Sequence, residues 1–183
     1  MNQQVSNINL PNALTVLRII LVPVFAWVYL LGAHWWALAI FLFAAVTDQL
    51  DGHLARKWNL ITDFGRLADP LADKALTLTA FVLLSIGYQS PWMWAFTILV
   101  AIRELGITVL REVLRHRWTV VAASSGGKLK TVLQILLIIL MLIPWGNLAV
   151  INWIIVGLAV VTFAITMISG WQYLWAAWRG SRP

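Results

Sequence analysis

The sequence contains no cysteine and few ionisable side chains of any kind. Its 183 residues include seven acidic residues and three histidines, and only 11% of the chain is charged. The absence of cysteine excludes disulfides, thiolate nucleophiles and thiolate-bound metals. Any metal site must therefore be built from carboxylate, carbonyl or imidazole groups.

Apolar residues take the place of the missing charge. They make up 61% of the chain, and the mean hydropathy is +0.84, whereas soluble domains are about 45–50% apolar and about 25% charged. This composition excludes a water-soluble or disordered chain. Because about 20 apolar residues cross a bilayer, the sequence predicts an all-α integral membrane protein with six transmembrane helices in a single domain, residues 1–183. The predicted spans are 14–31, 35–57, 70–87, 92–110, 128–143 and 148–175.

Lysine and arginine residues collect at alternate ends of these spans. Ten of the thirteen lie at the connection between the second and third spans, at the connection between the fourth and fifth, or after the last span, whereas the other three connections carry none. Since cytoplasmic loops collect these residues, both termini and the two longer connections are predicted to face the cytosol. The first cation is Arg18, so no basic signal-peptide region precedes the first span, and we expect that span to be retained. The net charge of +6 favours anionic lipid head groups and anionic substrates over nucleic acid.

Five of the seven acidic residues fall between Asp48 and Asp73. Asp48 and Asp51 are spaced i, i+3, and Asp69 and Asp73 are spaced i, i+4, so each pair shares a helix face. Two carboxylates about 5 Å apart repel by about 3 kcal/mol at an effective dielectric near 20. The four must therefore protonate, pair with cations or bind divalent metal. Four oxygen donors suit Mg²⁺ or Mn²⁺ and are enough to hold two such ions.

Two structural alternatives stay open for the acidic residues. Arg56 and Lys74 are close enough in sequence to pair with some of the carboxylates. Asp69 before Pro70 is also typical of a helix N-cap followed by proline, and Asp63 is expected to be a solvated loop residue.

The spacing of these residues forms a longer motif. Residues 48–73 fit D-x-x-D-G-x-x-A-R, then eight residues, then G-x-x-x-D-x-x-x-D, with all eight fixed positions present. This motif resembles that of the CDP-alcohol phosphatidyltransferase family, whose members displace CMP from a CDP-linked lipid or alcohol. Softer matches at residues 9–15, 69–74, 101–104 and 127–131 are similar to bacterial phosphatidylglycerophosphate synthases within it. The resemblance implies the CDP-alcohol phosphotransferase fold, a bacterial inner membrane and a homodimer.

The resemblance also implies roles for individual residues. Asp48, Asp51, Asp69 and Asp73 would hold two divalent ions, and Asp73 is the candidate general base for the acceptor hydroxyl. The CDP-linked lipid would contact five residues: Asn12, Thr15, Gly52, Arg56 and Gly65. Helix packing or turns remain the alternative for the two glycines, and helix capping is the alternative for the two residues of the first span.

An anionic acceptor is expected because four cations lie on the fourth and fifth spans near their cytosolic ends. They are Arg103, Arg111, Lys128 and Lys130. Arg103 lies deeper than the others, and a charge at that depth should face a polar cavity or pair with a carboxylate such as Glu104. For the other three, ordinary anchoring at the cytosolic face is the alternative.

These expectations combine into one function with stated rivals. The resemblance implies transfer of a phosphatidyl group from CDP-diacylglycerol to glycerol 3-phosphate, giving phosphatidylglycerophosphate and CMP. The nearest rival is a related transferase that uses inositol phosphate, serine or phosphatidylglycerol as acceptor. More distant rivals are an ion transporter lined by carboxylates and a scaffold with a degenerate site, but no inverted repeat supports the former and the intact motif opposes the latter.

Overall fold

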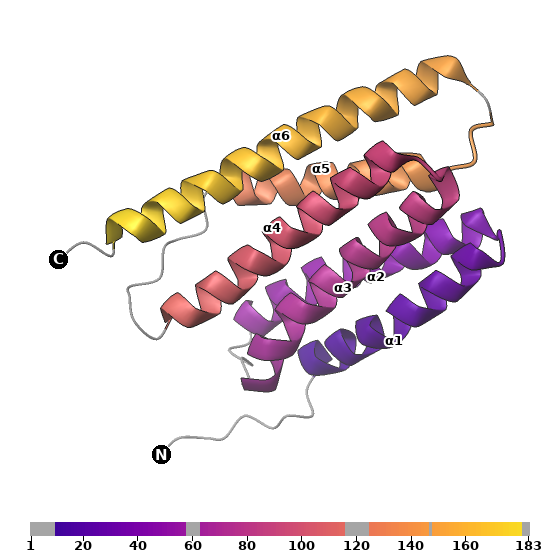
Figure 1. The fold of residues 1–183 in the computed structure, drawn as a ribbon. Coiled ribbons are helices and arrows are strands. Elements are labelled where there is room, and N and C mark those ends of the chain that lie inside the picture. Colours follow the sequence, from indigo (N-terminus) through magenta and orange to yellow (C-terminus); the bar gives the residue numbers. More distant parts are fainter. Residues whose placement is uncertain (1–9, 58–62, 116–124, 147, 181–183) are drawn as a thin grey trace. The chain divides into compact units, whose positions relative to one another are not determined.

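Six helices make up the computed structural model, which describes residues 10–57, 63–115, 125–146 and 148–180. The helices are α1 (Leu10–Leu30), α2 (His34–Lys57), α3 (Asp63–Tyr88), α4 (Pro91–Arg115), α5 (Ser125–Leu142) and α6 (Ala149–Gly180) (Figure 1). The described ranges contain no strand. The prediction of an all-helical chain with six helices is therefore confirmed.

Three of the helices are long and apolar enough to cross a membrane. Their apolar stretches are Ala13–Leu30, Pro91–Leu110 and Ala149–Ala176. The apolar stretches of the other three helices have 10–17 residues: His34–Asp48, Lys74–Tyr88 and Leu129–Leu142. These helices are shorter in apolar length because charged residues adjoin their apolar parts, and in α2 and α3 these are the residues of the acidic motif.

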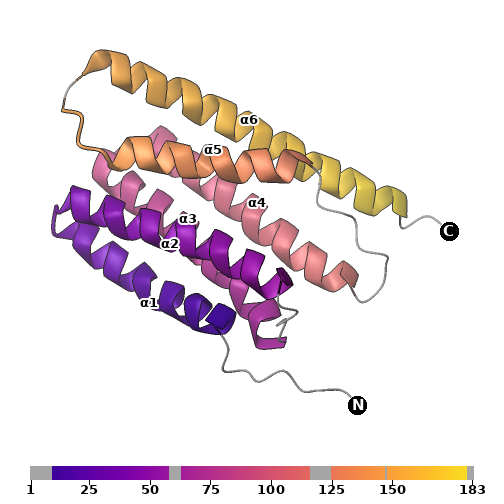
Figure 2. The same cartoon turned by 180° about the vertical axis from the view of Figure 1, so that it is seen from behind.

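The chain divides into two compact units, residues 1–83 and 84–183. In the first unit, α1 and α2 form an antiparallel hairpin and pack along each other (Figure 2). Gly32 makes the turn with φ of +77°, a conformation that glycine adopts without strain. Phe25 and Phe41 are fully buried between the two helices, with ring centroids 5.8 Å apart. Aromatic packing therefore fixes how α1 lies on α2.

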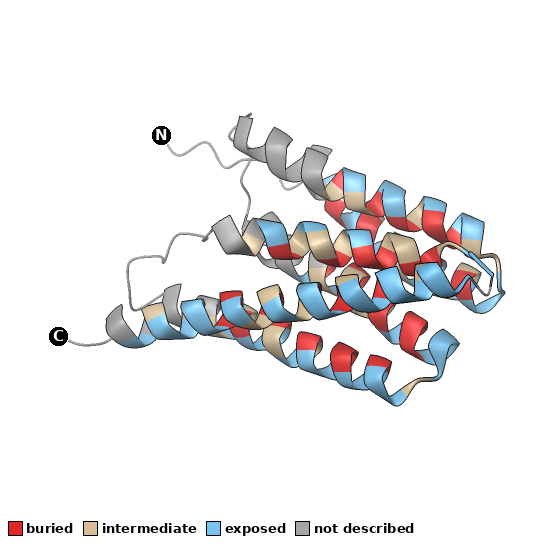
Figure 3. Ribbon diagram, turned by 90° about the horizontal axis from the view of Figure 1, so that it is seen from above, coloured by how far each residue is buried: buried red, intermediate tan, exposed pale blue. Residues whose placement is uncertain are grey.

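In the second unit, α6 packs against both α4 and α5. Buried apolar residues of the three helices form its core, among them Met93, Val100, Leu137, Ile138 and Ile155. Buried and exposed residues follow each other around the helices, and much of α6 is exposed (Figure 3). Exposed apolar side chains of this kind are what a helix presents to lipid.

The hairpin between the end of α3 and the start of α4 is closed by hydroxyl groups. Ser85 Oγ lies 2.8 Å from Thr97 Oγ1 and donates to the carbonyl oxygen of Met93 at 3.3 Å. Both hydroxyls are buried. In an apolar surrounding such groups need partners, and here they find them in the neighbouring turn of the hairpin.

Candidate active site

The acidic motif occupies the last turns of α2 and the first turns of α3. Asp48 and Asp51 both lie within α2, and Asp69 and Asp73 both lie within α3. Because the backbone is helical at these positions, each pair of aspartates shares one helix face. The helical backbone therefore agrees with the prediction that the two aspartates of each helix lie on one face.

The helix bounds correct one expectation about this region and exclude one alternative. Asp63 is the first residue of α3 rather than a loop residue, and α3 continues from there through Pro70. Asp69 accordingly lies inside the helix and does not cap its start. The helix begins earlier than hydropathy indicated because residues 63–69 are too polar to count toward an apolar span.

Most side chains of the predicted metal and CDP-lipid sites lie outside the described residues. They are Asn12, Asp51, Arg56, Asp69 and Asp73, and the surroundings of Gly52 and Gly65 also lie outside. Among the side chains that are described, no group of three or more His, Cys, Asp or Glu could hold a metal. The chemistry of the donor set fits Mg²⁺ or Mn²⁺, because carboxylates on adjacent turns supply hard oxygen ligands. The roles of these residues stay predictions.

Asp48 is the one motif carboxylate whose side chain is described. Its Oδ1 lies 2.7 Å from Nη1 of Arg18 on α1, and the Arg18 side chain is 0% exposed whereas that of Asp48 is 35% exposed. A guanidinium buried in an apolar span needs a countercharge, and Asp48 supplies it. The pair therefore links α1 to α2 and leaves part of the carboxylate accessible.

Sequence reasoning did not predict the Arg18–Asp48 pair. Two signals in the sequence pointed to it: Arg18 is the only charged residue of the first predicted span, and Asp48 is the first acidic residue of the chain. Thr15, predicted to contact the CDP-linked lipid, lies one turn before Arg18 and is likewise buried. The structure thus places Thr15 and Arg18 on the same face of α1.

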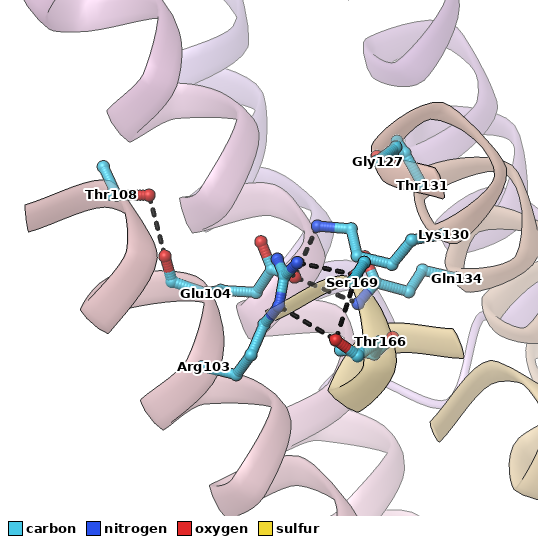
Figure 4. Close-up of polar contacts among 9 residues, drawn as sticks. All are labelled: Arg103, Glu104, Thr108, Gly127, Lys130, Thr131, Gln134, Thr166 and Ser169. Carbon is cyan, nitrogen blue, oxygen red and sulfur yellow. Dashed lines mark hydrogen bonds and ion pairs between the residues drawn. The ribbon is translucent and has the colours of Figure 1, made fainter. Parts of the chain in front are cut away.

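A second ionic cluster lies in the other unit, where side chains of α4, α5 and α6 meet around Glu104 (Figure 4). Oε1 of Glu104 accepts from Arg103 Nη1 at 3.0 Å, from Lys130 Nζ and from Gln134 Nε2 at 3.4 Å. The Glu104 side chain is 2% exposed and that of Lys130 is 5% exposed. One buried carboxylate therefore has two cations as partners.

Arg103 is anchored to α6 as well as to Glu104. Its Nε donates to the carbonyl oxygen of Thr166 at 3.1 Å, and its Nη2 donates to Ser169 Oγ at 2.7 Å. A Cβ at Gly170 would lie 3.1 Å from Arg103 Nε and 3.2 Å from its Cγ. The glycine therefore gives the arginine room to lie along α6.

The structure brings together two of the four predicted acceptor residues. Arg103 and Lys130 meet at Glu104, and the pair between Arg103 and Glu104 that the sequence left open is present. The side chains of Arg111 and Lys128 lie outside the described residues, although both positions belong to helices, α4 and α5. Sequence reasoning named Glu104 only as a possible partner of Arg103 and did not single out Gln134 or Ser169.

Comparison with known proteins gives the chain its family. The CDP-alcohol phosphatidyltransferase family model matches residues 8–176. A probable phosphatidylglycerophosphate synthase of Mycobacterium tuberculosis is 42% identical over 93% of this chain and 82% of its own length. The CDP-diacylglycerol–glycerol-3-phosphate 3-phosphatidyltransferases of Bacillus subtilis and Escherichia coli K12 are 36% and 38% identical, over 93% and 92% of this chain and 95% and 94% of their own lengths. These matches confirm the resemblance that the motif indicated: the chain belongs to the CDP-alcohol phosphatidyltransferase family.

Proposed function

We propose that this protein transfers the phosphatidyl group of CDP-diacylglycerol to glycerol 3-phosphate, giving phosphatidylglycerophosphate and CMP. One observation carries the proposal: the acidic motif is intact at all eight positions in a chain that is 36–42% identical, nearly end to end, to relatives named for this reaction. The membrane-crossing helices agree with a lipid substrate, since its acyl chains can stay in the bilayer.

In this proposal the four aspartates hold two divalent ions. When bound, such ions supply countercharge to the diphosphate and to the oxygens of the attacking and leaving groups. Arg18 fixes the Asp48 carboxylate from the α1 side, at 2.7 Å, so that its accessible part keeps one orientation. Arg56 adds a guanidinium that can donate two parallel hydrogen bonds to phosphate, and Gly52 and Gly65 leave room for the nucleotide. Asn12 and Thr15 contact the nucleotide.

Asp73 acts as the general base. It accepts the proton of an acceptor hydroxyl as that oxygen attacks the phosphorus bonded to diacylglycerol. A new oxygen–phosphorus bond forms, the bond from this phosphorus to the CMP phosphate oxygen breaks, and CMP leaves with the bonding electron pair. The proton balance of the reaction is one proton released per transfer.

The acceptor's phosphate binds to cations of α4 and α5. These cations are Arg103, Arg111, Lys128 and Lys130. Support comes from the two whose side chains are described, because Arg103 and Lys130 lie together at Glu104. A guanidinium and an ammonium side by side are donors that the oxygens of a phosphate monoester can accept from.

Placement in the membrane follows from the charge distribution. We place the chain in a bacterial inner membrane with both termini and the site on the cytosolic side, because lysine and arginine gather there. The lipid tails then remain in the inner leaflet while a water-soluble acceptor enters from the cytosol. A homodimer is proposed from the family resemblance alone.

The test is an acceptor comparison. Purified protein is incubated with CDP-diacylglycerol and Mg²⁺, and CMP release is measured with glycerol 3-phosphate, inositol phosphate, serine and phosphatidylglycerol in turn. We expect release with glycerol 3-phosphate and loss of release after chelation. Release with inositol phosphate alone would assign a different acceptor, and undiminished release after complete chelation would remove the metal from the proposal.

A further inference from the structure

The ionic cluster around Glu104 places one carboxylate between two cations, in helices where charge is costly. Arg103, Glu104 and Lys130 have side chains that are 12%, 2% and 5% exposed. A single charge at the centre of a membrane helix costs about 2.5–3.5 kcal/mol on insertion scales. Both cations donate to the same oxygen of Glu104, so the placement of each depends on this carboxylate.

Contacts connect the members of this cluster in a definite order. The Thr166 carbonyl and Ser169 hydroxyl of α6 hold the guanidinium of Arg103. Arg103 in turn donates to Oε1 of Glu104, and the same oxygen accepts from the ammonium of Lys130 on α5. Each group therefore fixes the next, from α6 through α4 to α5.

We infer that Glu104 is a positioning residue of the acceptor's phosphate subsite, holding the Lys130 ammonium in place while Arg103 holds Glu104. The inference rests on the proposed function, because it takes the acceptor to be a phosphate monoester. A lysine side chain carries about 2 kcal/mol of rotamer entropy. A carboxylate that already holds the lysine in one rotamer reduces the side-chain entropy that is lost when the phosphate binds. Glu104 thus acts through Lys130 and touches no reacting atom.

The first experiment compares Glu104→Gln, Lys130→Met and the double variant. Steady-state KM and kcat are measured for both substrates. We expect Glu104→Gln to raise the KM for glycerol 3-phosphate about tenfold, as for a lost hydrogen bond to a charged group, with the KM for CDP-diacylglycerol unchanged. The double variant should match Lys130→Met alone, because a group that acts through lysine has no effect without it.

Three outcomes of this experiment would overturn the inference. A lower KM for glycerol 3-phosphate in Glu104→Gln would mean that the carboxylate only repels the acceptor. Equal increases in KM for both substrates would indicate a general structural defect. Additive effects in the double variant would separate Glu104 from Lys130.

A second variant tests the inference without changing any charge, in case Glu104→Gln does not fold. Gly170→Ala places a Cβ 3.1 Å from Arg103 Nε, so Arg103 must shift, while alanine favours the helix by about 1 kcal/mol. We expect about a threefold higher KM for glycerol 3-phosphate, corresponding to part of one hydrogen bond. The matched control is Gly157→Ala on the same helix, where a Cβ meets nothing within 4 Å. An unchanged KM in Gly170→Ala would contradict the inference.

The wild-type protein separates the two proposals. If it releases CMP with glycerol 3-phosphate but Glu104→Gln and Gly170→Ala behave as wild type, only the positioning role fails. If it releases CMP only with an acceptor that carries no phosphate, such as serine, the proposed function fails and the phosphate subsite fails with it.

Discussion

The two ionic clusters of this protein differ in which charge is the more buried one. In the first unit the buried partner is a cation, with Arg18 0% and Asp48 35% exposed. In the second unit the carboxylate is the most buried member, with Glu104 2%, Lys130 5% and Arg103 12% exposed. The most exposed member is thus an aspartate in the first unit and an arginine in the second, in agreement with the proposed metal site at Asp48 and the proposed acceptor site at Arg103.

Both clusters also depart from the pairing that would cost least. An ion pair inside an apolar medium is least unfavourable when each charge has one partner and every lone pair is satisfied. Around Glu104 two cations share one oxygen, and beside Asp48 the sequence places three further aspartates within the motif.

The largest expected effect comes from removing the accessible negative charge. Asp48→Asn should lower CMP release by at least about a thousandfold if Asp48 is a metal ligand as proposed, because the residues of such a site act as a unit. The CMP assay with glycerol 3-phosphate measures the loss. The protein should still be folded by circular dichroism, and full activity in the variant would remove Asp48 from the metal site.

Arg18→Met removes the buried cation of the Arg18–Asp48 pair. It tests whether a divalent ion can replace this cation as the countercharge of Asp48. Asp48 then loses its partner, which should lower the free energy of unfolding by about 3 kcal/mol without divalent ions, as for a broken buried pair. Saturating Mg²⁺ should reduce this loss, since the ions replace the missing countercharge. Thermal unfolding in detergent, with EDTA or Mg²⁺, gives both values.

The control for Arg18→Met is Arg179→Met, which removes the same charge from the last turn of α6 and should give the same stability in EDTA as in Mg²⁺. Equal destabilisation of Arg18→Met in EDTA and in Mg²⁺ would show that Asp48 does not bind the ion. The first cluster would then be a structural pair only.

A smaller effect is expected at the α6 end of the second cluster. Ser169→Ala leaves Arg103 Nη2 without its acceptor at 2.7 Å, which should cost about 1.5 kcal/mol, the lower range for a bond to a charged group. The measurement is again thermal unfolding, together with the KM for glycerol 3-phosphate. A variant as stable as wild type would mean that α6 does not hold Arg103.

The smallest effect should come from a buried threonine hydroxyl on the same helix as Ser169. Thr162 Oγ1 is buried on α6 and has no hydrogen-bond partner among the described residues. Thr162→Val keeps the shape and removes a buried polar group, so stability should stay equal or rise by about 1 kcal/mol. A clear loss of stability would indicate a partner for this hydroxyl and weaken the contrast with Ser169.

Sequence reasoning found the helices because hydropathy is a local property. The predicted span 35–57 differs by one residue from α2, and 92–110 lies inside α4. The start of α3 at Asp63 was missed, since its first turns are polar and carry the motif. The length of an apolar run thus predicts the bounds of a helix well only where no charged functional residues occupy part of that helix.

The ionic pairs required information that no local pattern holds. Whether Arg18 reaches Asp48 depends on the rotation of α1 against α2, which the turn at Gly32 and the packing of Phe25 on Phe41 determine. Likewise, Lys130 reaches Glu104 only through the packing of three helices. The motif spacing predicted which aspartates share a helix face, but not which cations of other helices meet them.

The contact between Arg103 and Glu104 has a consequence for how this protein is made. The two are the only charged residues in the apolar stretch Pro91–Leu110 of α4, and they bond to each other within that helix at 3.0 Å. Ribosomes synthesise α4 before α5 and α6, so this stretch carries its own counterion before Lys130 and Ser169 are made. Its net charge is zero, which lowers the cost of placing it in lipid.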